Sequence, residues 1–247
     1  MNDFTFCTAG STPALEYAQD ALQAAGFSLT TQPGAGVTHL LLPVPSFDSE
    51  GNIKGGGSLP KRLAQLPEDI TVIGGNLDQP QLEGYRCLDL LKDPLYTARN
   101  AAITAHCALA LAMERLPVTL DGQRILVIGW GRIGKCLGQL LRGLGARVTI
   151  AARKESDRVM LKALGYGAED TANLSTTAYR VVFNTVPQMV CPDCPGKALK
   201  VDLASRPGLG GADVIWARGL PGTMTPESSG QLIAGSVIRL LKEGSGV

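Results

Sequence analysis

The sequence predicts an α/β protein with two doubly wound parallel sheets. Short apolar stretches of strand length alternate with helical segments along the 247 residues, a pattern typical of parallel sheets flanked by helices. A long segment rich in small residues, from Lys92 to about Arg115, separates two such alternating halves. The second half also contains a glycine pattern, Gly129-Trp-Gly131-Arg-Ile-Gly134, directly after an apolar stretch. Together these observations indicate two domains joined by a helix.

Residues 1–92 are expected to form an N-terminal α/β domain on the substrate side. The helix expected at 12–25 places Ala14, Leu15, Ala18 and Leu22 at helical spacing. Strands are expected at 4–7, 27–30, 38–42, 70–73 and 86–88, with a short helix at 59–66. The glycine-rich segment 48–58 is expected to be a flexible loop.

Residues 93–117 are expected to form a bridging helix and linker, opened by Asp93-Pro94. Residues 118–224 follow as a dinucleotide-binding domain, and residues 225–247 as a C-terminal helix returning towards the N-terminal domain. The second domain is expected to contain strands at 124–128, 147–151, 181–184, 200–203 and 214–216, and a helix at 135–144.

The glycine pattern is the G-x-G-x-x-G fingerprint of a Rossmann dinucleotide site. Gly129 allows a tight turn after the strand, Gly131 lets the backbone approach a pyrophosphate, and Gly134 lets the helix pack closely on the strand. The helix N-terminus then offers free N–H groups to the phosphates. We therefore expect cofactor contacts from Gly129, Gly131, Arg132, Ile133 and Gly134.

Coenzyme preference is indicated by the end of the next strand. An NAD site usually carries Asp or Glu there for the ribose 2′-hydroxyl, whereas this chain has Ala152-Arg153-Lys154. A guanidinium and an ammonium attract a 2′-phosphate, so NADP is predicted, with NAD as the alternative. Arg153 and Lys154 could instead be solvated loop charges.

Polar and proline-containing loops follow two later strands. Asn184-Thr-Val-Pro187 and Asp202-Leu-Ala-Ser-Arg206 stand where open α/β sheets place ligands. The cofactor contacts expected from these loops come from Thr185, Pro187, Ala204 and Ser205. Ordinary loop punctuation by proline and glycine is the alternative interpretation.

Composition fits a soluble intracellular enzyme. Hydrophobic residues make up 45% of the chain and the formal net charge is +1, so neither nucleic acid nor a membrane is an expected partner. No signal peptide is recognised, and cytoplasm is the expected location. Six cysteines in a chain of this length do not form a disulfide framework. Cys191-Pro-Asp-Cys194 lacks further ligands for zinc, and no metal is expected.

The residues from Leu120 to about Ala234 resemble the family of the dipicolinate synthase A protein of bacterial spore formation. The matching segments are 127–134, Gly145-Ala146 with Ala152-Arg153, 184–187, 202–208, and Gly219-Leu-Pro-Gly222 with Pro226 and Gly230-Gln231. The resemblance implies a two-domain arrangement like that of the hydroxyacid dehydrogenases, with a nicotinamide nucleotide in the second domain. It also implies oxidation of dihydrodipicolinate to dipicolinate beside a separate flavoprotein, the second component of the synthase. The chain departs from the family pattern at His106-Cys107, where Glu-Gly is expected, and at the apparent insertion Leu209-Gly210.

Three residues are candidates for the chemistry. The chain has 2 histidines, of which His106 is the preferred base, although a buried structural histidine is the alternative. Arg206 is the best-placed cation for a small dicarboxylate substrate. Glu50, with Ser46, is expected to cap the cleft from the first half unless both are ordinary loop residues. Water, a carboxylate or a partner subunit could equally accept the proton.

These inferences predict an NADP-dependent oxidoreductase like the dipicolinate synthase A protein, with homo-oligomer formation left open. One alternative is a nicotinamide-binding protein without catalysis of its own that supports a flavoprotein. Another is a different small dehydrogenase acting on an amino or imino acid.

Overall fold

The structure of the protein is a computed structural model that describes residues 4–244. The chain divides into two compact units, one made of residues 1–100 and 221–247 and the other of residues 101–220. The boundary falls within helix α3 (Pro94–Arg115). Among the described residues no helix is long and apolar enough to cross a membrane.

Unit 1 is built on a parallel sheet of strand order β2-β1-β3-β4-β5. Its strands are β1 (Thr5–Thr8), β2 (Ser28–Thr30), β3 (His39–Leu41), β4 (Thr71–Gly74) and β5 (Arg86–Asp89). Its helical segments are α1 (Pro13–Ala24), α2 (Leu59–Leu63), the 3-10 turn η1 (Pro80–Leu82) and α7 (Pro226–Gly244). Strands β2 and β3 lie on opposite sides of β1, so the sheet reverses its direction of growth there.

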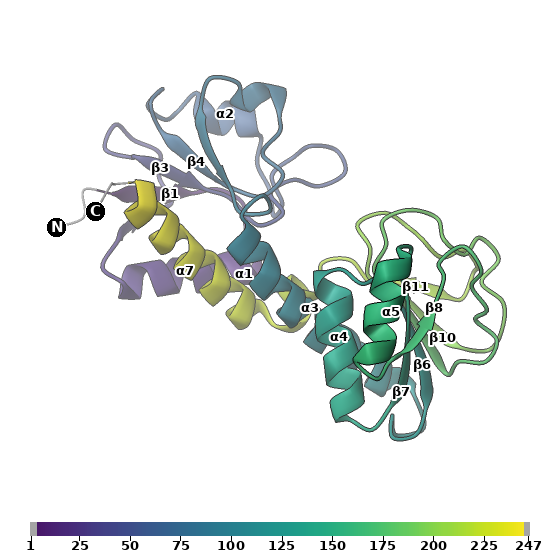
Figure 1. The fold of residues 1–247 in the computed structure, drawn as a ribbon. Helices are drawn as coiled ribbons and strands as arrows, with labels where there is room; N and C mark the ends of the chain where they lie inside the picture. Colours follow the sequence, from purple (N-terminus) through teal and green to yellow (C-terminus); the bar gives the residue numbers. More distant parts are fainter. Residues whose placement is uncertain (1–3, 245–247) are drawn as a thin grey trace. The chain divides into compact units, whose positions relative to one another are not determined.

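Helix α7 packs along α1, as Figure 1 shows. The approach is close at Gly230, where an added Cβ would lie 2.4 Å from the Cβ of Tyr17 and 2.7 Å from the carbonyl oxygen of Ala14. A glycine is therefore required at this contact between the helices.

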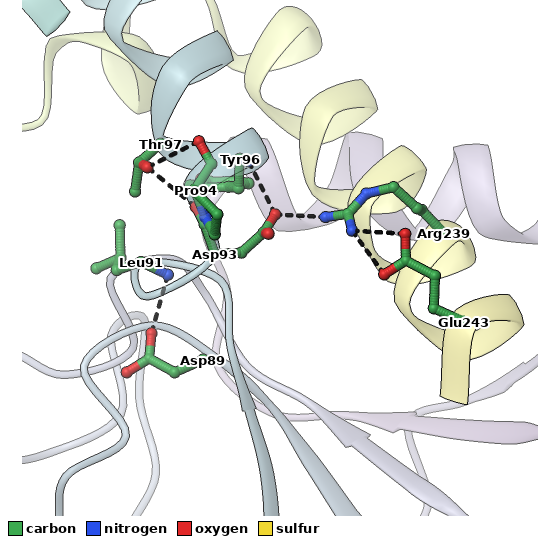
Figure 2. Close-up of polar contacts among 8 residues, drawn as sticks. All are labelled: Asp89, Leu91, Asp93, Pro94, Tyr96, Thr97, Arg239 and Glu243. Atoms are coloured by element: carbon green, nitrogen blue, oxygen red, sulfur yellow. Dashed lines mark hydrogen bonds and ion pairs between the residues drawn. The ribbon is translucent and has the colours of Figure 1, made fainter. Parts of the chain in front are cut away.

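A charged cluster ties α7 to the start of α3 within unit 1 (Figure 2). Arg239 forms an ion pair with Asp93 and a second one, at 3.0 Å, with Glu243. Asp93 also accepts a hydrogen bond from the backbone N–H of Tyr96 at 2.8 Å. The same carboxylate thus caps α3 and binds α7.

Unit 2 is built on a parallel sheet of strand order β11-β10-β9-β6-β7-β8. Its strands are β6 (Arg124–Ile128), β7 (Arg147–Ala151), β8 (Gly167–Glu169), β9 (Val181–Asn184), β10 (Leu199–Asp202) and β11 (Val214–Trp216). Its helices α4 (Arg132–Gly143) and α5 (Glu155–Ala163) connect β6, β7 and β8, and α6 (Leu220–Met224) follows β11. The predicted class, α/β with two parallel sheets, is confirmed.

The two faces of the second sheet are covered differently. Leu137 and Leu141 of α4 and Leu161 of α5 pack on one face, together with small residues of α3. The other face is covered by connecting segments that contribute Tyr179, Cys191, Cys194 and Leu209. Strand β8 and helices α5 and α6 were not predicted from the sequence.

Segment 48–58 is a built turn rather than a featureless loop. One carboxylate oxygen of Asp48 accepts hydrogen bonds from the N–H groups of Glu50 and Asn52, both at 2.9 Å. Phe47 and Ile53 form an antiparallel bridge, and Ile53 is buried in the core. The segment expected to be a flexible loop therefore contains defined turns, because glycine content indicates turns as readily as flexibility.

Candidate functional site

The fingerprint turn lies between β6 and α4, at the point where β6 has β9 on one side and β7 on the other. Gly129 has φ +107°, and an added Cβ would lie 2.3 Å from the hydroxyl oxygen of Thr185. An added Cβ on Gly134 would lie 2.1 Å from the carbonyl oxygen of Gly129. Only glycine fits at these two positions, so the turn brings the helix directly onto the strand.

Helix α4 begins at Arg132, three residues earlier than the sequence analysis expected. Gly131 is its N-cap and provides no side chain to accept from the first-turn N–H groups. Nothing lies within 4 Å of where a Cβ of Gly131 would be. The first turn therefore keeps its N–H groups free beside open space, as phosphate binding requires.

The first-turn side chains differ in their surroundings. Arg132 is exposed, whereas Ile133 packs against the core of unit 2. A phosphate contact from Ile133 would therefore come from its backbone N–H alone.

A cavity of about 270 Å³ opens beside this turn. It is lined by Gly129, Trp130, Ala151, Ala152, Arg153, Lys154, Asp157, Thr171, Val186, Gln188 and Val190. We call this cavity the nucleotide pocket, after the nucleotide site that the sequence predicts here. Of the predicted cofactor residues, Gly129, Arg153 and Lys154 line it.

The nucleotide pocket carries both signs of charge. The side chains of Arg153 and Lys154 are exposed, and Asp157 in the first turn of α5 lies with them. Sequence reasoning missed Asp157 because α5 itself was not predicted. The sequence does contain a signal for a helix N-terminus here, since Glu155 and Asp157 are acidic and begin a short amphipathic segment.

Thr185, which is predicted to touch the cofactor, also supports the turn. Its hydroxyl donates to the carbonyl oxygen of Ile128 at 2.9 Å and lies where a Cβ of Gly129 would be. Pro187, two residues further on, is exposed.

A buried pair, Asn184 and Asp202, organises the loops that follow β9 and β10. The side-chain amide of Asn184 donates to Asp202 at 2.8 Å and to the carbonyl oxygen of Val186 at 3.0 Å. Asp202 also accepts from the N–H groups of Ala204 (3.1 Å), Gly208 (2.6 Å) and Leu209 (3.0 Å). One carboxylate therefore fixes both loops.

Residues 205–207 form the part of this region that remains accessible. Ala204 is buried, and its carbonyl oxygen accepts from the indole N–H of Trp216 at 3.0 Å. Ser205 and Arg206 are exposed. The Arg206 side chain is therefore accessible on a loop whose two ends, Ala204 and Gly208, are held by hydrogen bonds to Asp202.

His106 lies apart from the nucleotide pocket. It is exposed on α3 and lines a separate cavity of about 600 Å³ with Leu109, Cys136, Gln139 and Leu140 among others. The interpretation of His106 as a buried structural histidine was wrong. No residue is common to the two cavities.

Glu50 and Ser46 belong to unit 1 and have different surroundings. Glu50 is exposed in the turn at 47–53 and accepts a hydrogen bond from the Asn52 amide at 3.4 Å. Ser46 is fully buried, donates to the carbonyl oxygen of Pro43 at 2.8 Å and accepts from the N–H of Gly75 at 2.9 Å. Ser46 therefore joins two loops, and its expected role at a cleft was wrong.

The cysteines of Cys191-Pro-Asp-Cys194 are both buried and free. Burial, and then a hydrogen bond with Cys194, raises the pKa of the Cys191 thiol to about 11. Such a thiol stays protonated and unreactive at neutral pH. Within residues 4–244 no group of three or more His, Cys, Asp or Glu side chains could hold a metal ion.

Comparison with known proteins relates the chain to one enzyme in particular. No family model matches the chain. The A component of dipicolinate synthase from Bacillus subtilis is 30% identical over 159 residues, which cover 58% of this chain and 54% of the relative. The match thus spans about half the length of that relative.

Solved structures extend the likeness to the whole fold. The dipicolinate synthase A protein from Bacillus halodurans has a TM-score of 0.84 at 19% identity, covering 97% of this chain and 98% of the other. The corresponding protein from Bacillus subtilis has a TM-score of 0.80 at 20% identity, covering 98% and 97%. D-lactate dehydrogenase from Escherichia coli has a TM-score of 0.59 at 14% identity, covering 98% and 97%.

The resemblance predicted from the sequence is therefore confirmed: the chain is similar to the dipicolinate synthase A protein in sequence and shares its two-sheet, hydroxyacid-dehydrogenase-like fold.

Proposed function

We propose that the protein is an NADP-dependent oxidoreductase that oxidises dihydrodipicolinate to dipicolinate in the manner of dipicolinate synthase. The observation that carries the coenzyme choice is the pocket wall after β7. There Arg153 and Lys154, rather than an acidic residue, come directly after the strand end and line the nucleotide pocket. Fixed cations at this place favour a 2′-phosphate over a 2′-hydroxyl.

The residues present fit a dinucleotide. The uncapped first turn of α4 and the open space at Gly131 suit a pyrophosphate, and the nucleotide pocket suits the adenosine end. A bound nicotinamide would supply the hydride acceptor. The protein's own part is to hold the substrate, and for this we propose Arg206 and Ser205, exposed on the loop that Asp202 fixes. A guanidinium pairs well with the carboxylates of such a substrate.

Aromatisation of the dihydropyridine ring releases one hydride and one proton. His106 lines a different cavity, and His39 is buried in β3. We propose that the proton passes to water or to a group on a flavoprotein partner. The same observation favours a second candidate function, a nicotinamide-binding protein that has no catalysis of its own.

Binding titrations of NADPH and NADH, followed by the fluorescence of Trp130 in the nucleotide pocket, test the coenzyme choice. Arg153→Ala should weaken NADPH binding about 10- to 100-fold, since a hydrogen bond to a charged group contributes about 1.5–3 kcal/mol. Asp157→Asn is the matched control, because it removes a negative charge from the same pocket. It should strengthen NADPH binding about threefold, since the Asp157 carboxylate repels the phosphate. Equal affinities of the unaltered protein for NADPH and NADH would refute the proposal.

Turnover of enzymatically generated dihydrodipicolinate with NADP, with and without the flavoprotein partner, separates the two candidate functions. The isolated chain should be slow, and the partner should raise the rate at least about tenfold, within what one positioned acid or base contributes. Arg206→Ala should weaken substrate binding and leave NADP affinity unchanged. Absence of turnover in both conditions, with NADPH binding intact, would favour the non-catalytic role.

A further inference from the structure

We propose that Arg158 is a positioning residue that sets the coenzyme preference of the nucleotide pocket; this inference rests on the nicotinamide site proposed above. Arg158 lies on α5, and its side chain is 21% exposed. Its Nη1 donates to the carbonyl oxygens of Ala152 at 2.9 Å and Arg153 at 2.7 Å. Both residues line the pocket.

The same guanidinium also reaches a second segment that lines the pocket. Arg158 forms an ion pair with Asp170 at 3.0 Å, and Asp170 accepts from the N–H of Ala172 at 3.0 Å. Thr171, between those two residues, lines the pocket. Arg158 thus joins the turn after β7 to the segment after β8.

The direction of these bonds decides which groups face a ligand. The carbonyl oxygens of Ala152 and Arg153 are occupied by Arg158, while the side chains of Arg153 and Lys154 stay exposed. Removal of Arg158 would free two acceptor oxygens and leave the carboxylate of Asp170 without its cation. Both changes act against a 2′-phosphate, which only accepts hydrogen bonds from the protein at neutral pH. A ribose 2′-hydroxyl can donate to such oxygens, so NADH is tolerated.

This asymmetry separates a positioning role from a merely structural one. A general loosening of the pocket would weaken both nucleotides alike, whereas loss of positioning changes their ratio. Arg158→Lys keeps a positive charge, but its side chain is one bond too short to place the ammonium where Nη1 of Arg158 lies, so it should restore part of the preference.

The test is titration of NADPH and NADH into the unaltered protein and the variants Arg158→Ala, Arg158→Lys and Arg142→Ala. Arg142 is the matched control because its Nη1 also donates to a backbone carbonyl, that of Leu164 at 2.6 Å, just past the far end of α5. Arg158→Ala should weaken NADPH binding about tenfold and NADH binding less than about twofold, a difference of the size of one charged hydrogen bond. Arg142→Ala should change neither.

The outcomes are distinguishable. An unaltered protein without preference for NADPH refutes the proposed coenzyme. A preference that persists in Arg158→Ala, or an equal loss of both nucleotides, overturns the role of Arg158 alone. If Arg158→Ala fails to fold, Arg158→Lys decides the question: an unchanged NADPH to NADH ratio in that variant overturns the positioning role, and a reduced ratio supports it.

Discussion

The β1–α1 turn of unit 1 and the β6–α4 turn of unit 2 occupy the same place in their sheets and are built in opposite ways. Each follows a strand with parallel neighbours on both sides, where the sheet reverses its growth. Open α/β sheets bind ligands at such points. The two turns differ in capping and packing, so their position in the sheet does not by itself decide whether a ligand can bind.

In unit 1 the backbone N–H groups of the turn and of the first turn of α1 form hydrogen bonds within the chain. The Thr12 side chain caps α1 by accepting from the N–H of Leu15 at 3.3 Å. The N–H of Ser11 donates to the carbonyl oxygen of Lys54 at 3.2 Å, and a Cβ on Gly10 would lie 2.3 Å from that oxygen. The cavity beside this turn, about 290 Å³, is lined by the acidic Glu16 as well as Arg62. The side-chain cap on α1 and the backbone oxygen beside Gly10 make this turn unsuitable for a phosphate.

In unit 2 the corresponding turn is left open. Gly131 caps α4 without a side chain and has no neighbour where a Cβ would be. The same position in the sheet therefore occurs with a capped, filled turn in unit 1 and with an uncapped, open turn in unit 2, and only the second leaves room for a phosphate.

We expect the largest loss of stability when Asp202, which holds the loops after β9 and β10 in unit 2, is removed. Asp202→Ala would leave buried donors unpaired, each at a cost of about 1–3 kcal/mol, so we expect a loss of about 3–4 kcal/mol. Both tryptophans of the chain, Trp130 and Trp216, lie in unit 2, so denaturant unfolding followed by tryptophan fluorescence reports this unit.

Asp89→Ala is the control in unit 1. Asp89 accepts from the N–H groups of Asn76, Leu77 and Leu91 at 3.2, 2.9 and 2.9 Å. Its removal should shift unfolding measured by circular dichroism and leave the tryptophan transition in place. A tryptophan transition unaffected by Asp202→Ala would contradict the assignment of Asp202 as the support of the loops.

The next effect is an acid sensitivity of unit 1 that depends on His39. His39 is buried between Phe4 and Phe6, and burial, with a smaller contribution from the charge of Arg86, lowers its pKa from 6.5 to about 4. Between about pH 6.5 and 4 the unfolded chain binds a proton that the native protein does not. Stability is therefore fully present above pH 6.5 and falls by about 3 kcal/mol as the pH drops to 4.

His39→Leu should remove this pH dependence in unfolding followed by circular dichroism. His106→Gln, on the exposed face of α3, should leave it in place. The tryptophan-monitored transition of unit 2 should be the same in both variants. Identical acid curves for the unaltered protein and His39→Leu would show that His39 is not the responsible group.

We expect the smallest effects from alanine substitutions at Gly131 and Gly10, one in each of the two turns. Gly131→Ala should keep the stability and weaken NADPH binding about tenfold, because a methyl group enters the space where a phosphate would approach. Gly10→Ala should do the reverse and cost about 1–3 kcal/mol, since Gly10 has φ +87° and its Cβ would meet the carbonyl oxygen of Lys54. Calorimetric titration and thermal unfolding of both variants measure the two effects. Stability loss in Gly131→Ala, or loss of NADPH binding in Gly10→Ala, would contradict the comparison.

The sequence by itself determined the β–α alternation, both parallel sheets and the glycine turn after β6. These features depend on local patterns, namely apolar strands, helical spacing and glycines at fixed offsets. The cations Arg153 and Lys154 were found in the same way, because their position after a predicted strand is local information.

Only the tertiary structure decided which side chains meet. Helix α5 is short and has a single fully buried apolar residue, Leu161. It was not predicted from the sequence, and Asp157 and Arg158 were missed with it. The sequence indicates only that Ser46 is a polar residue next to a proline-rich loop. In the structure it is buried and forms hydrogen bonds with the backbone of Pro43 and Gly75. Hydrogen bonds between residues far apart in the chain leave no periodic trace in the sequence. For that reason the turn was predictable, and the contacts that hold its pocket were not.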